Sequence, residues 1–72
     1  MLKRIKELRI EKGFSEEEVA KVLGISSKLY CKIENGDILI RVSQLVGFCR
    51  FFNITPDYIL ELINEKRELP NE

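Results

Sequence analysis

The amino-acid sequence predicts a small all-α domain, and three observations support that prediction. Hydroxyl side chains stand where helices would begin, and glycines stand where they would end. Apolar residues recur at three- and four-residue steps between these signals, and no segment alternates with the two-residue period of a strand. The length of 72 residues leaves room for one domain, and helices with short connections suit a chain of that size.

The start and stop signals divide the chain into five expected helices, residues 2–12, 16–23, 27–35, 42–52 and 56–65. Ser15, Ser26 and Thr55 each stand at an N-cap position, with an apolar residue just before and another four residues after. Glu18 completes a capping box with Ser15. Pro56 occupies the first position of the fifth helix, where its missing N–H costs nothing.

Glycines end the first three helices, at Gly13, Gly24 and Gly36. The fourth helix has weaker signals, because Arg41 is a poor N-cap and Gly47 costs about 1 kcal/mol relative to alanine inside a helix. Apolar residues nevertheless follow one another along it at helical spacing: Val42, Leu45, Val46, Cys49 and Phe52. Corresponding apolar positions in the first two helices are Leu2, Ile5, Leu8, Val19, Ala20 and Leu23.

Charge is distributed unevenly along a chain whose net charge is zero. Residues 1–50 have a net charge of +3 and residues 51–72 a net charge of −3, so the basic part can face phosphate while the acidic part faces away. No run of about 18 apolar residues is present, so we expect no membrane span. Charged residues follow the first four, which argues against a signal peptide and favours a cytoplasmic location.

The two cysteines, Cys31 and Cys49, have neither CxxC nor zinc-site spacing, and the chain contains no histidine. A reduced pair is expected because Cys49 belongs to an apolar pattern typical of a core, with a disulfide as the alternative. We expect no metal and no cofactor. Without histidine or a glycine-rich phosphate loop, an enzyme is not expected either.

The third expected helix has an apolar side and a polar side. The apolar side carries Ser26, Leu29, Tyr30 and Ile33. The opposite side carries two cations, an amide and a thiol but no acid: Lys28, Lys32, Asn35 and Cys31, with Ser27 at its edge. Lysine can donate to guanine or to phosphate, so this stripe suits the DNA major groove. The alternative is an ordinary solvated helix face.

The spacing of these signals resembles that of the lambda-repressor-like, Cro/C1-type helix-turn-helix domains of bacteria and phage, also called the XRE family. The matching residues are Ile5-Lys6, Leu8-Arg9, Lys12-Gly13, Ser15, Glu17-Glu18, Ala20, Leu23-Gly24-Ile25-Ser26, Ile33-Glu34-Asn35-Gly36 and residues 53–60. The resemblance implies a compact five-helix domain over residues 1–65 with its helix-turn-helix at 15–35, followed by a short tail at 66–72.

The resemblance also implies roles for individual residues in binding double-stranded DNA. Ser27, Lys28 and Lys32 correspond to residues that contact base edges. Those expected to contact phosphate are Ser26, Asn35 and Arg41. Cys31 would touch a thymine methyl group or the backbone.

Two positions depart from the family pattern. Glu16 stands where the family usually has glutamine, and a carboxylate there repels phosphate although it favours the helix dipole. The connection after the third helix, residues 37–40, contains three consecutive aliphatic residues where basic or polar residues and proline are usual. These aliphatic residues either fold back onto the core or form an exposed patch for a partner.

The function expected from the sequence is that of a sequence-specific, repressor-like transcriptional regulator acting as a homodimer on an inverted repeat. Candidate dimer contacts are apolar residues of the connection and the last helix: Ile38, Leu39, Ile40, Tyr58, Leu62 and Ile63. The alternative is a protein-interaction or antitoxin-like module that keeps the fold but binds DNA weakly or not at all. Zero net charge, Glu16 and the aliphatic connection motivate that alternative.

Overall fold

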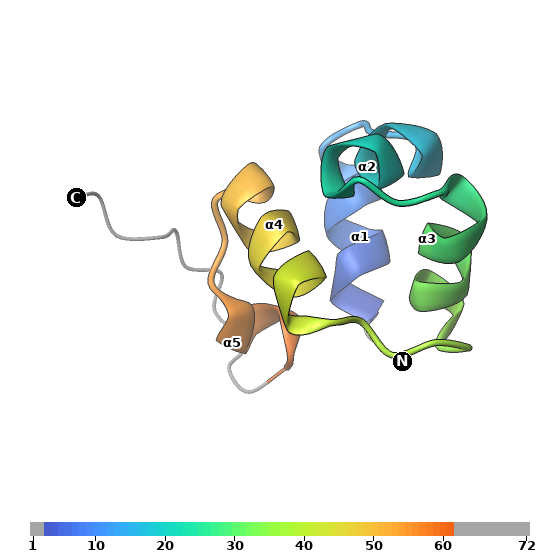
Figure 1. Ribbon diagram of the computed structural model, residues 1–72. Helices are drawn as coiled ribbons and strands as arrows, with labels where there is room; N and C mark the ends of the chain where they lie inside the picture. Colours follow the sequence, from blue (N-terminus) through green and yellow to red (C-terminus); the bar gives the residue numbers. More distant parts are fainter. Residues whose placement is uncertain (1–2, 62–72) are drawn as a thin grey trace.

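The computed structural model describes residues 3–61, and this part of the chain is built from helices without strands. The helices are α1 Lys3–Glu11, α2 Glu16–Leu23, α3 Ser27–Asn35, α4 Val42–Phe52 and α5 Pro56–Ile59 (Figure 1). The predicted all-α fold with five helices is confirmed. None of the helices described is long and apolar enough to cross a membrane.

The starts of α2 and α3 have the caps that the sequence predicts. The Ser15 hydroxyl accepts the Glu18 N–H at 3.1 Å, and the Glu18 carboxylate accepts the Ser15 N–H at 2.8 Å. Ser26 caps α3 by accepting the Leu29 N–H at 3.1 Å. These bonds satisfy backbone donors that have no partner inside the helix, and they fix the first residue of each helix.

The start of α5 differs from the prediction. Thr55 has the extended backbone of an N-cap, but its hydroxyl makes no capping hydrogen bond and is buried without a partner among the described residues. The N–H that it would have capped, on Tyr58, donates instead to the Asp57 carboxylate at 3.1 Å. The helix also ends early: Leu60 and Glu61 form a turn, and the rest of the predicted span, residues 62–65, lies outside the described residues.

The two weak points predicted for α4 are both compensated. The Arg41 side chain provides no cap. The Gln44 side chain instead accepts the Arg41 backbone N–H at 2.8 Å, and this hydrogen bond stabilises the start of the helix. Gly47 faces α2, where an added Cβ would lie 3.2 Å from the Leu23 side chain. The glycine therefore allows close packing between α2 and α4, which offsets its intrinsic cost to the helix.

The core lies where the five helices meet. Its buried side chains are Ile5, Leu8, Val19, Ala20, Tyr30, Ile33, Phe48, Cys49, Ile54 and Ile59. Phe14, Phe51 and Phe52 make edge contacts with one another at its border, and the Phe52 ring also packs at a tilted angle against the buried Phe48 ring. Cys49 is buried, as predicted, and both cysteines are free thiols. Val42 and Val46, in contrast, are exposed, so the buried side of α4 is narrower than its apolar pattern suggests.

Candidate nucleic-acid interface

α2 and α3 form a two-helix unit joined by a tight turn. Gly24 takes the left-handed conformation with a φ of 71°, and the Ile25 N–H donates to the Ala20 carbonyl at 3.0 Å. The two helices pack against each other and leave one long side of α3 at the edge of the molecule (Figure 1). This arrangement is a helix-turn-helix.

The outer side of α3 carries polar residues, as its sequence pattern predicts. Ser27, Lys28, Lys32 and Asn35 are exposed, and Cys31 is partly exposed. The acid of this helix, Glu34, is buried on the opposite side. The exposed surface of α3 therefore presents two ammonium groups, hydroxyl and amide groups, and no carboxylate of its own.

A buried ion pair holds α3 against α1. The Arg9 guanidinium donates to both carboxylate oxygens of Glu34, at 2.6 Å through Nε and 3.3 Å through Nη2. Its Nη1 donates to the Phe14 carbonyl at 2.8 Å. Arg9 is 9% exposed and Glu34 is 3% exposed, and the hydrogen bond to Glu34 raises the pKa of Arg9 further. The pair ties the last turn of α3 to the start of the helix-turn-helix.

This pair is absent from the sequence-based prediction, although the sequence contains a signal for it. Arg9 follows Ile5 by four residues and Glu34 follows Tyr30 by four, so each charge falls on the apolar side of its helix. A charged residue is rarely fully buried without a partner. Two opposite charges at apolar positions of neighbouring helices thus indicate an ion pair, but only when the helices are known to be in contact.

Tyr30 lies next to this pair on the inner side of α3. Its side chain is fully buried, and its hydroxyl has no hydrogen-bond partner among the described residues. Burial raises the pKa of the hydroxyl well above its usual value, and the Glu34 carboxylate raises it further. The inner side of α3 thus contains a paired charge and, next to its carboxylate, a buried hydroxyl that makes no hydrogen bond of good geometry with the residues described.

Glu16 lies at the edge of the polar side of α3 rather than apart from it. It is partly exposed at the first position of α2, and its interaction with Cys31 raises the pKa of that thiol. Glu18, in the same turn, is engaged by Ser15, and those hydrogen bonds lower the pKa of its carboxyl. The surface beside Cys31 therefore includes a carboxylate supplied by α2.

The aliphatic residues of the connection between α3 and α4 do not all behave alike: one folds back onto the core, and two are exposed. Ile40 is partly buried and packs against the core. Ile38 and Leu39 are 39% and 89% exposed. Arg41, which follows them, is exposed at the N-cap of α4.

The candidate dimer residues at the other end of the chain lie in different surroundings. Tyr58 is partly buried and packs against the core. The Arg4 guanidinium lies 4.2 Å from the centre of its ring and donates to its carbonyl at 2.8 Å. Leu62 and Ile63 lie outside the described residues.

The fold and the arrangement of α2 and α3 define a helix-turn-helix domain of the lambda-repressor-like class. Comparison with protein families agrees: the family described as "Helix-turn-helix domain" matches residues 2–65, and the chain belongs to that family. The resemblance to XRE-type domains is confirmed.

The chain is also similar to a protein of Bacillus subtilis (strain 168) named "Uncharacterized HTH-type transcriptional regulator YqaF". The two are 53% identical over 36 residues, which cover 50% of this chain and 47% of that protein. The matched region thus spans about half the length of the curated relative.

Proposed function

We propose that this protein is a sequence-specific DNA-binding transcriptional regulator that inserts α3 into the major groove. The observation that carries the proposal is the outer side of α3, which is polar, contains two cations and has no exposed acid of its own. In a helix-turn-helix, the second helix lies in the major groove with its first residues at the base edges. The name of the Bacillus subtilis relative supports the regulatory role.

We assign to the individual residues the roles that the family resemblance implies, and their exposed positions support this assignment. Ser27 and Lys28, in the first turn of α3, and Lys32, one turn later, contact base edges. Phosphate contacts come from residues at the ends of helices: Ser26, Asn35 and Arg41. Cys31 lies between the two lysines, where it meets a thymine methyl group or the backbone.

We propose that the protein acts as a homodimer on an inverted repeat, as a repressor. The domain measures 31 × 23 × 23 Å, so one copy reaches a single half-site. Two copies related by a twofold axis would place their α3 helices about 34 Å apart, one turn of DNA. Ile38 and Leu39 are the exposed candidates for the contact between copies.

A protein-interaction or antitoxin-like module is the second candidate. It is favoured by the exposed Leu39 side chain and by the carboxylate of Glu16 beside α3, which opposes phosphate. In that case the same fold would bind a partner protein, and DNA binding would be weak.

Selection of bound DNA from a randomised pool at low salt tests the main proposal. We expect an inverted repeat with half-sites about one helical turn apart. Affinity should fall with salt, with a log–log slope near −0.9 for each phosphate neutralised. If folded protein retains no DNA from the pool, the main proposal is wrong. A stoichiometric protein partner without DNA retention would favour the second candidate.

A further inference from the structure

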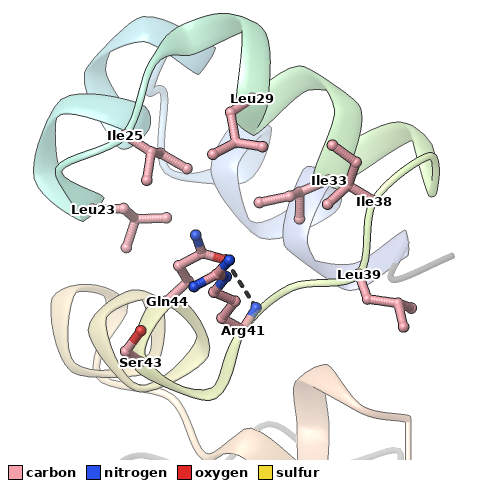
Figure 2. A pocket seen from close by; sticks show the side chains of 9 residues that line it. All are labelled: Leu23, Ile25, Leu29, Ile33, Ile38, Leu39, Arg41, Ser43 and Gln44. Atoms are coloured by element: carbon pink, nitrogen blue, oxygen red, sulfur yellow. Dashed lines mark hydrogen bonds between the residues drawn. The ribbon is translucent and has the colours of Figure 1, made fainter.

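A groove of about 420 Å³ lies beside the helix-turn-helix, between the apolar side of α3 and the start of α4. Figure 2 shows Leu23, Ile25, Leu29 and Ile33 pointing into it from the α2–α3 side. Ile38 extends this apolar wall along the connection. The walls are aliphatic, without an aromatic ring, so they suit a flexible alkyl group better than a flat ring.

Polar side chains line the opposite side of the groove, near the start of α4. Arg41, Ser43 and Gln44 supply a guanidinium, a hydroxyl and an amide (Figure 2). Arg41 is the charged residue among those that line the groove, which include no acid. The groove therefore combines an apolar wall with a cationic rim.

The guanidinium of Arg41 is available to a bound molecule. Its backbone N–H is held by Gln44, so the base of the side chain is fixed at the helix start. Within residues 3–61, the structure shows no ion pair that engages the guanidinium. A carboxylate is the simplest group that would pair with it, and the Ser43 hydroxyl could donate to the same group.

We propose that this groove binds a small amphipathic carboxylate, with its alkyl chain against the leucine and isoleucine side chains and its carboxylate at Arg41. The volume lies within the range of about 300–1,000 Å³ that is usual for small-molecule sites. Apolar walls with a few polar groups are also typical of such sites. The positive charge of Arg41 favours an anionic ligand over a cationic or neutral one.

Binding in this groove would compete with DNA. Arg41 is a phosphate contact in the proposed function, so a carboxylate at its guanidinium removes that contact. Linkage requires that the ligand and the operator weaken each other's binding by the same factor. This second step rests on the proposed function, whereas binding of the carboxylate does not.

Titration of the ¹⁵N-labelled full chain with hexanoate, octanoate and decanoate tests the binding site. We expect saturable shifts of amide resonances along α3 and at the start of α4, including Leu29 and Ser43. The dissociation constant should fall by up to about fourfold for each added CH₂ that is buried, until the groove is filled. Decanol should bind up to about fivefold more weakly than decanoate, as expected for an exposed ion pair.

A pair of charge variants separates the site from general attraction. Arg41→Gln should reduce decanoate affinity to that of decanol and leave decanol affinity unchanged. Lys21→Gln removes an exposed cation on α2 outside the groove and should change neither. Ile38→Ser, at the partly exposed apolar wall, should weaken both molecules alike.

Three results would overturn the proposal. One is the absence of saturable shifts at α3 and α4 with every chain length. The second is equal affinity of Arg41→Gln and the original protein for decanoate. The third is a set of shifts at the same amides that depends on protein concentration without ligand and is unaffected by decanoate, which would assign the groove to a second copy of the chain.

The competition with DNA is measured on the operator obtained from the randomised pool. Saturating decanoate should raise the dissociation constant for DNA by the same factor by which DNA raises that for decanoate. Simultaneous, independent binding would overturn the competition. If the protein retains no DNA but binds decanoate, the proposed function fails while the site stands.

Discussion

The two sides of α3 carry charge in opposite ways. On the inner side, the Glu34 carboxylate is buried and receives two hydrogen bonds from Arg9. On the outer side, Lys28 and Lys32 are exposed on a surface where α3 itself offers no acid. The inner carboxylate pairs with Arg9 and holds the helix in place, whereas the outer ammonium groups remain available to a ligand. Substitutions on one helix should therefore separate stability from binding.

The largest expected effect comes from breaking the inner pair. Glu34→Ala leaves the Arg9 guanidinium buried without its carboxylate, which should lower the free energy of unfolding by about 3–5 kcal/mol. Urea denaturation measures this loss. Glu7→Ala, at an exposed position of α1, is the matched control and should change the free energy of unfolding by less than about 0.5 kcal/mol.

Removing both charges distinguishes a buried unpaired charge from simple loss of contacts. Arg9→Met combined with Glu34→Leu leaves neither charge buried, and such replacements are often close to neutral. We expect the double variant to recover at least half of the stability lost in Glu34→Ala. A double variant as unstable as the sum of its single variants would contradict this account of the inner side.

The next largest effect should come from the outer side and should appear in binding alone. Lys28→Ala or Lys32→Ala should weaken binding to the selected operator by about 1–3 kcal/mol if each lysine contacts a base. The free energy of unfolding should change by less than about 0.5 kcal/mol. Fluorescence anisotropy and urea denaturation measure the two quantities, with Lys6→Ala on α1 as the control. Equal weakening by all three variants would argue for general charge attraction.

Tyr30 gives a smaller effect that depends on pH. The native pKa of its hydroxyl is raised above the unfolded value of about 10, so the unfolded chain loses this proton first. The contribution of this pKa shift to the free energy of unfolding is fully present below pH 10, and it is lost as the pH rises above that value. Tyr30→Phe should remove this part of the decline.

At neutral pH the same substitution should be neutral or stabilising by up to about 1 kcal/mol, because the buried hydroxyl lacks a partner. Denaturation between pH 7 and pH 11 measures both effects. Tyr58→Phe serves as the control. It retains Tyr30, so its stability should still decline above pH 10. A marked loss of stability in Tyr30→Phe at pH 7 would show that the hydroxyl has a stabilising partner.

Local signals in the sequence were sufficient for most of the fold. The expected bounds of α2 and α3 agree with the structure, because caps at Ser15 and Ser26 and the left-handed Gly24 and Gly36 act on neighbouring residues. The expected bounds of α4 agree as well, although its signal is the spacing of its apolar residues. Even the polar side of α3 follows from periodicity. These features depend on interactions between residues that are close in sequence.

Features that depend on distant contacts could not be predicted in the same way. The pairing of Arg9 with Glu34 joins residues 25 positions apart. The exposure of Val42 depends on how α4 packs on α2, and the groove lies between the start of α4 and the α2–α3 unit. Each requires knowledge of which helices are in contact.

Glu16 gives the smallest expected effect and lies where the outer side of α3 meets α2. Glu16→Gln removes the carboxylate beside Cys31 and should strengthen DNA binding by about 0.2–1 kcal/mol. The gain should be similar for every DNA sequence, because the charge opposes phosphate rather than a base. The same substitution should lower the pKa of the Cys31 thiol, measured by its alkylation rate against pH. Glu17→Gln removes a charge from the same turn and should leave that thiol pKa unchanged. If both variants strengthen DNA binding alike and neither changes the thiol, then Glu16 acts only as part of the acidic first turn of α2, and its contact with α3 has no bearing on binding.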